Sequence, residues 1–214
     1  MAVLLTGGTG KTSVRLARFL QDAKIPFLLA SRKVEAEAPS GMSATKFDWL
    51  DSSTFENPFQ YKFPNGQSIS AVYLVAPEIS DPSPSITAFV DLAIEKHGVR
   101  RFVLLTGSTT EVGGVYVGKL WQHLVDLGVE YCVLRATWFM GTFSPNTPDY
   151  QWTFSGWRNG TRKLLRAAVY CIDQKRRQDL YCVWGRPNPI HQRPGYRSRS
   201  ISRAYRCEAT QHRL

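Results

Sequence analysis

A glycine-rich turn between a short apolar run and a longer amphipathic segment constrains the fold of this 214-residue chain more than any other feature. The apolar run covers residues 2–6, the turn contains Gly7, Gly8 and Gly10, and residues 11–22 carry apolar side chains at helical spacing. Glycines at such a junction let the backbone turn sharply and approach a phosphate at the N-terminus of the helix. The junction therefore predicts a strand, a phosphate-binding turn and a helix.

The spacing of the turn favours a dinucleotide as the ligand, with a plain strand-to-helix turn as the alternative. The third position of the usual glycine pattern is Ser13, which keeps a small residue where helix and strand meet.

The segment Gly10-Lys11-Thr12 also matches the end of a P-loop. That motif needs glycine at position 5, where this chain has Leu5, so a P-loop is excluded.

Short β-rich runs alternate with segments of helical periodicity as far as about Ser144. We expect strands at residues 2–6, 26–31, 45–48, 71–75, 101–106 and 131–134, and helices at 11–22, 83–96 and 117–127. Residues 51–59 and 64–67 are expected to be polar, turn-rich connections. The predicted fold class is α/β, a Rossmann-like doubly wound parallel sheet with helices on both faces.

Candidate cofactor-binding residues follow the first four expected strands. A basic residue after the second strand accepts the 2′-phosphate of NADPH, where an acidic one would bind the ribose of NADH, so Arg32 predicts NADPH. A solvated Arg after a strand is the alternative. Asp48 and Trp49 are placed near the adenine, with packing as the alternative for Trp49. The expected cofactor-binding residues are Thr6, Gly7, Gly8, Thr9, Gly10, Lys11, Thr12, Ser31, Arg32, Asp48, Trp49, Val75, Ala76 and Pro77.

Three polar residues after the fifth expected strand are the catalytic candidates. Ser108 lies at the carboxyl end of that strand, and Lys119 and His123 lie one turn apart on the next expected helix. Tyr116 and Lys119 are separated by two residues, which departs from the Tyr-x-x-x-Lys spacing of a proton relay. A lone helical histidine is often structural, which is the alternative for His123. The sequence contains no paired carboxylates, no Ser-His-Asp arrangement and no metal-ligand cluster, so no metal is expected.

The charge of the chain is divided unevenly. Residues 1–150 contain 13 Lys and Arg against 14 Asp and Glu, whereas residues 151–214 contain 14 against 3. Residues 164–169 fit one helical turn or strand, and residues 193–206 lack an apolar face, so we expect them to be disordered. We therefore divide the chain into an NAD(P)-binding domain at 1–149 and a basic, disordered tail at 150–214.

Cysteine spacing and hydropathy predict the cellular setting. Cys171, Cys182 and Cys207 form neither a Cys-x-x-Cys motif nor a zinc-like spacing with histidine. No apolar stretch approaches the roughly 18 residues needed to span a bilayer, and the N-terminus lacks the basic region of a signal peptide. We expect a cytoplasmic protein without a membrane partner.

Several motifs together resemble the fungal festuclavine and agroclavine dehydrogenases, which belong to the NmrA-like branch of atypical short-chain dehydrogenases. The resemblance covers residues 1 to about 144 and rests on the glycine turn, Phe47-Asp48-Trp49-Leu50, Gly118-Lys119 and Leu134-Arg135-x-Thr137-Trp138-Phe139-Met140. It implies an NADPH-binding Rossmann domain that reduces the iminium formed when chanoclavine-I aldehyde cyclises in ergot alkaloid biosynthesis. The implied partner is thus a small alkaloid intermediate, and either festuclavine or agroclavine is the product.

The chain departs from that family at three places. Gly141 and Thr142 replace an acidic residue and an amide residue of the family motif, and Trp121 stands where the family often has histidine. The family also continues for more than a hundred residues past the position of Phe143 to build a substrate lobe, which nothing here matches, so we expect that lobe to be missing.

We hypothesise that a shift of reading frame explains the tail. Codons chosen for residues 178–203 read KIYTASGDGQIPFISAPDIAAVAFR after a one-base shift, and this peptide closely resembles the family's continuation. We therefore expect residues from roughly Tyr150 onward to be a frame-shifted or mis-spliced translation. Lacking the cover of a substrate lobe, the product is expected to be poorly soluble, with little or no turnover.

Two other functions remain open. NmrA-like proteins include regulators that bind NADP and a partner protein without catalysis, and loss of the substrate lobe favours that outcome. The tail at face value resembles a nucleic-acid-binding arm, because Tyr and Trp are interspersed among its basic residues. The frame shift explains the same charges, so we do not expect nucleic acid as a partner.

Overall fold

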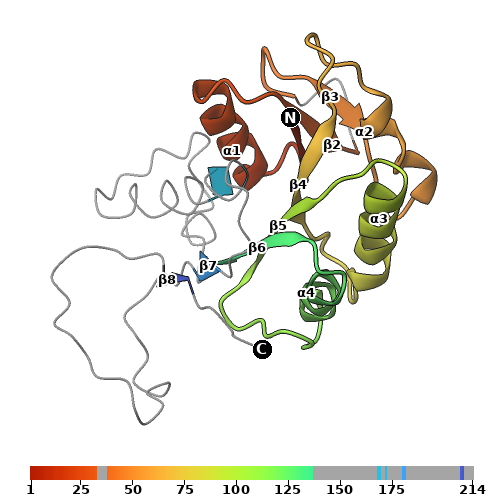
Figure 1. The fold of residues 1–214 in the computed structure, drawn as a ribbon, viewed down its shortest axis with the longest axis vertical. Coiled ribbons are helices and arrows are strands. Elements are labelled where there is room, and N and C mark those ends of the chain that lie inside the picture. Colours follow the sequence, from red (N-terminus) through yellow and green to blue (C-terminus); the bar gives the residue numbers. More distant parts are fainter. Residues whose placement is uncertain (33–37, 137–167, 170–171, 173–179, 182–207, 210–214) are drawn as a thin grey trace, which may run out of the picture.

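A parallel six-stranded sheet forms the centre of the molecule (Figure 1). The computed structural model describes residues 1–32, 38–136, 168, 169, 172, 180, 181, 208 and 209. The strand order is β3-β2-β1-β4-β5-β6, and every neighbouring pair is parallel. The strands are β1 (Ala2–Thr6), β2 (Phe27–Ser31), β3 (Ala44–Lys46), β4 (Ile69–Val75), β5 (Arg101–Gly107) and β6 (Glu130–Ala136). The order reverses between β1 and β4, which is where doubly wound sheets bind ligands.

Helices cover both faces of this sheet (Figure 1). Helix α1 (Lys11–Asp22) packs on one face, and α3 (Ser83–Glu95) and α4 (Val117–Asp126) pack on the other. Successive side chains of β1 supply both cores, since Ala2 and Leu4 pack with α3 and α4 whereas Val3 and Leu5 pack with α1. Burial on both faces explains why the strands are continuous apolar runs.

The predicted fold class is confirmed, with boundaries that differ by a few residues. The expectation for residues 51–59 is wrong, because they contain the 3-10 helix η1 (Ser52–Thr54) and the start of helix α2 (Asn57–Gln60). The Asp51 side chain accepts a hydrogen bond from the Ser53 amide and so caps η1, and Phe55 is buried in the core. Phe59 of the same segment packs against this core as well, and both phenylalanine rings contact Phe89 of α3.

Most of the expected tail lies outside the described residues, including residues 193–206 and the segment that begins at Thr137. Within the described part, Ala168, Val169 and Ile172 are helical, and β7 (Leu180–Tyr181) pairs antiparallel with β8 (Glu208–Ala209). Ala168 and Ile172 are buried on the α1 face of the sheet. No helix among the described residues is both long and apolar enough to cross a membrane.

Candidate functional site

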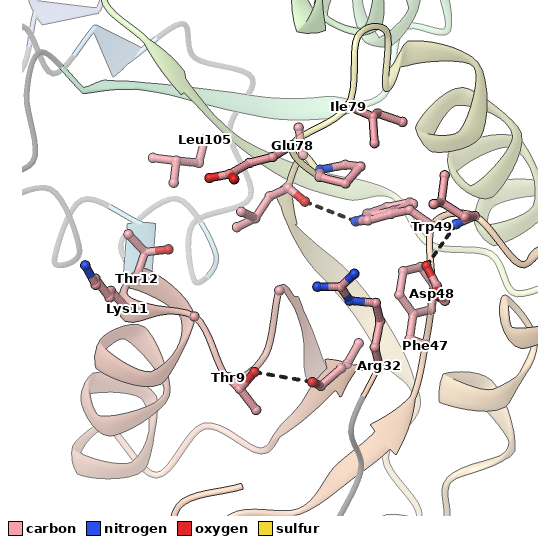
Figure 2. A pocket seen from close by; sticks show the side chains of 18 of the residues that line it. Thr9, Lys11, Thr12, Arg32, Phe47, Asp48, Trp49, Glu78, Ile79 and Leu105 are labelled. Atoms are coloured by element: carbon pink, nitrogen blue, oxygen red, sulfur yellow. Dashed lines mark hydrogen bonds between the residues drawn. The ribbon is translucent and has the colours of Figure 1, made fainter. Parts of the chain in front are cut away.

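A cavity of about 770 Å³ opens at the carboxyl ends of the strands, at the point where the strand order reverses. Its walls come from the glycine turn, the first turns of α1, the ends of β2 and β4, and the segment after β3 (Figure 2). The lining residues are Gly7, Thr9, Gly10, Lys11, Thr12, Arg15, Ala30, Ser31, Arg32, Phe47, Asp48, Trp49, Leu50, Val75, Ala76, Pro77, Glu78, Ile79 and Leu105. Most of the residues expected to bind a cofactor are therefore brought together.

The glycine turn is too tight for side chains. Gly7 has a φ of +61°, and the Gly10 amide donates to the Gly7 carbonyl oxygen over 2.7 Å. A Cβ at Gly10 would lie 2.9 Å from that oxygen, and one at Gly8 would lie 2.9 Å from the Ala30 amide nitrogen. The turn therefore requires glycine at these positions, and it leaves the floor of the cavity as bare backbone.

Two expected binding residues, Thr6 and Gly8, hold the turn without lining the cavity. The Thr6 hydroxyl donates to the Tyr73 carbonyl oxygen over 2.9 Å and accepts from the Val75 amide over 2.8 Å, which joins β1 to β4. Ser13, in the third glycine position, is buried and donates its hydroxyl to the Thr6 carbonyl oxygen over 2.8 Å. A small hydroxyl residue thus replaces the third glycine and bonds α1 to β1.

The N-terminus of α1 faces the cavity without a side-chain cap. Gly10 is the N-cap and makes no side-chain cap hydrogen bond, and the first turn contains no acidic residue. Lys11, Thr12 and Arg15 line the cavity beside these amides, and Arg15 also donates to the Lys11 carbonyl oxygen over 2.6 Å. Amides at a helix N-terminus together with cationic side chains attract an anion.

The wall formed by β2 and the segment after β3 carries the predicted ribose and adenine residues. The hydroxyls of Thr9 and Ser31 are 3.3 Å apart, and the exposed Arg32 directs its guanidinium into the cavity toward Trp49 (Figure 2). Asp48 lines the cavity while its Oδ1 accepts from the Leu50 amide over 3.0 Å. Arg32 therefore lines the cavity, and its contact with a 2′-phosphate stays a prediction.

The opposite wall contains lining residues that sequence reasoning missed. Val75, Ala76 and Pro77 are where they were expected, but Glu78, Ile79 and Leu105 complete this side. Glu78 and Ile79 directly follow the expected residues, so the end of β4 was a signal for them. Arg15 lies four residues after Lys11, one helical turn away, and this spacing was also available. The other missed lining residues are Ala30, Phe47 and Leu50.

The three catalytic candidates do not line this cavity. Lys119 Nζ donates to Asp81 Oδ2 over 2.7 Å, and His123 Nε2 lies 2.6 Å from Asp91 Oδ1, which joins α4 to α3. The Ser108 amide donates to the Ala136 carbonyl oxygen over 2.8 Å at the carboxyl ends of β5 and β6. Their catalytic roles stay predictions.

Tyr116 contacts the segment after β4 without lining the cavity itself. Its hydroxyl donates to the Pro77 carbonyl oxygen over 2.7 Å, and its backbone has a φ of +58°. Burial raises the pKa of the Tyr116 hydroxyl, and the negative charge of Glu78 raises it further. Tyr116 thus holds the segment after β4 in place.

No cluster of three or more His, Cys, Asp or Glu side chains suited to a metal ion occurs in the part of the chain that the structure describes. The described lining residues supply hydroxyls, cations, carboxylates and backbone amides to the cavity.

Sequence comparison confirms the expected resemblance. The chain is 43% identical over 154 residues to festuclavine synthase II of Penicillium roqueforti, covering 71% of this chain and 52% of that protein. It is 43% identical over 145 residues to agroclavine dehydrogenase of Claviceps fusiformis, covering 67% and 49%. The chain thus spans about half the length of the curated relatives it matches. No family model matches it.

Two solved structures share the fold at low sequence identity. WbmH of Bordetella bronchiseptica in complex with NAD+ has a TM-score of 0.59 at 14% identity, covering 85% of this chain and 75% of that one. The triphenylmethane reductase of Citrobacter sp. complexed with NADP(H) has a TM-score of 0.57 at 15% identity, covering 85% and 68%.

Proposed function

The chain is related over about two thirds of its length to the festuclavine synthases and agroclavine dehydrogenases of fungi, and from this premise we propose that it is an NADPH-dependent reductase. Its proposed substrate is the iminium derived from chanoclavine-I aldehyde, and its product is festuclavine or agroclavine. One observation carries the proposal: the cavity at the reversal of strand order joins an uncapped helix N-terminus to Arg32. The upstream intermediate decides between the two products.

The cavity residues fit such a cofactor. The bare backbone of the glycine turn and the first amides of α1 would hold the pyrophosphate, with Lys11 and Arg15 beside it. Arg32 would hold the 2′-phosphate, and Asp48 and Trp49 would flank the adenine. The reduced nicotinamide supplies a hydride when it is bound.

The protein's own contribution is mainly orientation. An iminium carbon is already electrophilic, so the hydride step needs no strong acid, and holding the reactants in line supplies much of the acceleration. The walls after β4 and β5 would present Val75, Ala76 and Leu105 to the substrate side of the cofactor. Ser108, Lys119 and His123 remain the proposed catalytic residues.

The Lys119–Asp81 and His123–Asp91 pairs favour a second candidate function. Side chains already engaged in ion pairs are less available for chemistry, which suits a non-catalytic NADP-sensing regulator of the NmrA-like type.

One experiment separates these functions. The purified 214-residue protein is titrated with NADPH and with NADH, and it is then offered the iminium while NADPH absorbance is followed. If the protein is the proposed reductase, we expect saturable NADPH binding, weaker NADH binding and substrate-dependent loss of NADPH absorbance. Binding without turnover supports the sensor, whereas absence of binding contradicts both functions.

A further inference from the structure

Charged side chains divide the cavity into two chemically different halves. Lys11, Arg15, Arg32 and Asp48 stand on α1, β2 and the segment after β3. Among the lining residues in the described part of the chain, Glu78 is the charged side chain on the β4 and β5 half. In a doubly wound sheet, the first three strands bind one nucleotide of a dinucleotide and the remaining strands bind the other. Glu78 thus stands on the half where the nicotinamide and the substrate would lie.

The backbone around Glu78 is held in place. The Pro77 carbonyl oxygen accepts from the Tyr116 hydroxyl over 2.7 Å and from the Ile79 amide over 3.0 Å. Figure 2 shows the Glu78 side chain extending across the cavity toward Leu105. The contribution of Glu78 to the raised pKa of Tyr116 agrees with a carboxylate close to that hydroxyl.

The other residues that line this half of the cavity are apolar. Val75, Ala76, Ile79 and Leu105 supply no charge and no side-chain hydrogen-bond donor. Glu78 is itself exposed, so its carboxylate would attract a cation with the modest strength of a solvent-exposed ion pair. The apolar wall offers little specific binding to a neutral polar group.

We propose that Glu78 is the specificity-determining residue that selects a positively charged substrate over a neutral one of the same shape. This inference rests on the proposed function and deepens it, since it assigns recognition of the iminium charge to one side chain. A neutral aldehyde or ketone lacks the charge that Glu78 would bind.

The charge balance of the reduction agrees with this role. A hydride adds to the iminium carbon, and the π electrons of the C=N bond become the lone pair of the amine nitrogen. The positive charge leaves the substrate and appears on the nicotinamide ring, and no proton is transferred. A carboxylate on this half faces a cation before and after the step.

A pair of isosteric probes tests the proposal. N-methylisoquinolinium is a planar cation, and 2-methylnaphthalene is its neutral isostere. Binding of each is measured by tryptophan fluorescence with and without NADPH, in the wild type, Glu78→Gln and the control Glu95→Gln. Glu95 is an exposed carboxylate on α3 outside the cavity lining. We expect Glu78→Gln to weaken cation binding about fivefold, as for an exposed ion pair, and to leave binding of the neutral probe unchanged.

Several outcomes would overturn the proposal. Equal loss of affinity for both probes would indicate a change of shape, and equal cation binding in wild type and Glu78→Gln would remove the role of the charge. A similar effect of Glu95→Gln would indicate a general effect of net charge, and failure of the cation to bind would also contradict the proposal. Failure of NADPH to bind would instead contradict the proposed function, since the probe ratio is still measured in the cofactor-free protein.

Discussion

The indole Nε1 of Trp49 donates a hydrogen bond to the Val75 carbonyl oxygen over 3.1 Å. The bond joins the segment after β3 to the carboxyl end of β4, and the strands β2 and β1 lie between β3 and β4 in the sheet. Trp49 also packs edge-to-face on Phe47 and Phe89, with ring centroids 4.7 Å and 5.5 Å away. One side chain therefore contributes both to the core and to a wall of the cavity.

The Trp49 bond predicts a measurable loss of stability. We expect Trp49→Phe to lower the free energy of unfolding by about 1 kcal/mol, because it keeps an aromatic ring and removes the hydrogen bond. Urea denaturation measures this change. Leu50→Ala is the control, since Leu50 is 68% exposed and should change stability by less than about 0.5 kcal/mol. An equal loss in both variants would contradict the account.

We expect Arg32 to determine the preference for NADPH over NADH. Arg32→Ala should weaken NADPH binding about tenfold or more and leave NADH binding unchanged, because charge-assisted hydrogen bonds contribute about 1.5–3 kcal/mol. Calorimetric titration with both cofactors measures the ratio. Arg18→Ala removes an exposed cation of α1 outside the cavity lining and serves as the control. Equal weakening of NADH binding by Arg32→Ala would speak against a 2′-phosphate contact.

A side chain at position 10 should distort the glycine turn. In Gly10→Ala the new Cβ meets the Gly7 carbonyl oxygen at 2.9 Å. We expect a loss of about 1–3 kcal/mol of stability from overpacking and weaker NADPH binding, measured by thermal denaturation and by titration below the transition. In Gly107→Ala the nearest atom to the new Cβ is 3.9 Å away, so this control should bind normally. Normal NADPH binding by Gly10→Ala would show that the turn tolerates a side chain.

The ion pairs of Glu56 should make a pH-dependent contribution to the free energy of unfolding. Its carboxylate accepts from Lys96 Nζ over 2.9 Å and from His97 Nε2 over 2.6 Å, and these bonds, Lys96 first, lower the pKa of Glu56. A pKa lower in the folded than in the unfolded state stabilises the fold above the unfolded value of about 4.3, and the effect disappears as pH falls through the folded value.

Urea denaturation at neutral and acidic pH tests this contribution. We expect the stability difference between wild type and Glu56→Gln to be present at neutral pH and to shrink below about pH 4.3. Glu95→Gln, at an exposed position of α3, should show no such trend. A difference that grows on acidification would reverse the assigned sign.

We propose that residues 150–214 are a frame-shifted translation, which nucleotide sequencing tests directly. The genomic DNA and a transcript across residues 178–203 should encode KIYTASGDGQIPFISAPDIAAVAFR in the frame shifted by one base. A different peptide in that frame would rule out the frame shift. The basic charge of the tail would then be a property of the encoded protein.

Local pattern predicted most of the elements. The strands and long helices follow from short apolar runs and helical periodicity, which each segment carries in its own residues. The short helix α2 escaped prediction because four residues carry too little periodicity, and its position depends on neighbours such as Phe55 that are buried only after β3 and α3 pack. Elements that are specified by their own residues were therefore predicted, whereas an element that depends on packing against distant residues was not.

The candidate site shows the same division. The turn through Gly7 and Gly10, with Arg32 after the second strand, was readable in the sequence because backbone sterics and the end of a strand are local properties. Tertiary structure alone decided that Lys119 meets Asp81, 38 residues away, and that His123 meets Asp91, 32 residues away. Contacts between distant residues depend on how helices and strands pack together, and no single segment of the chain specifies that packing.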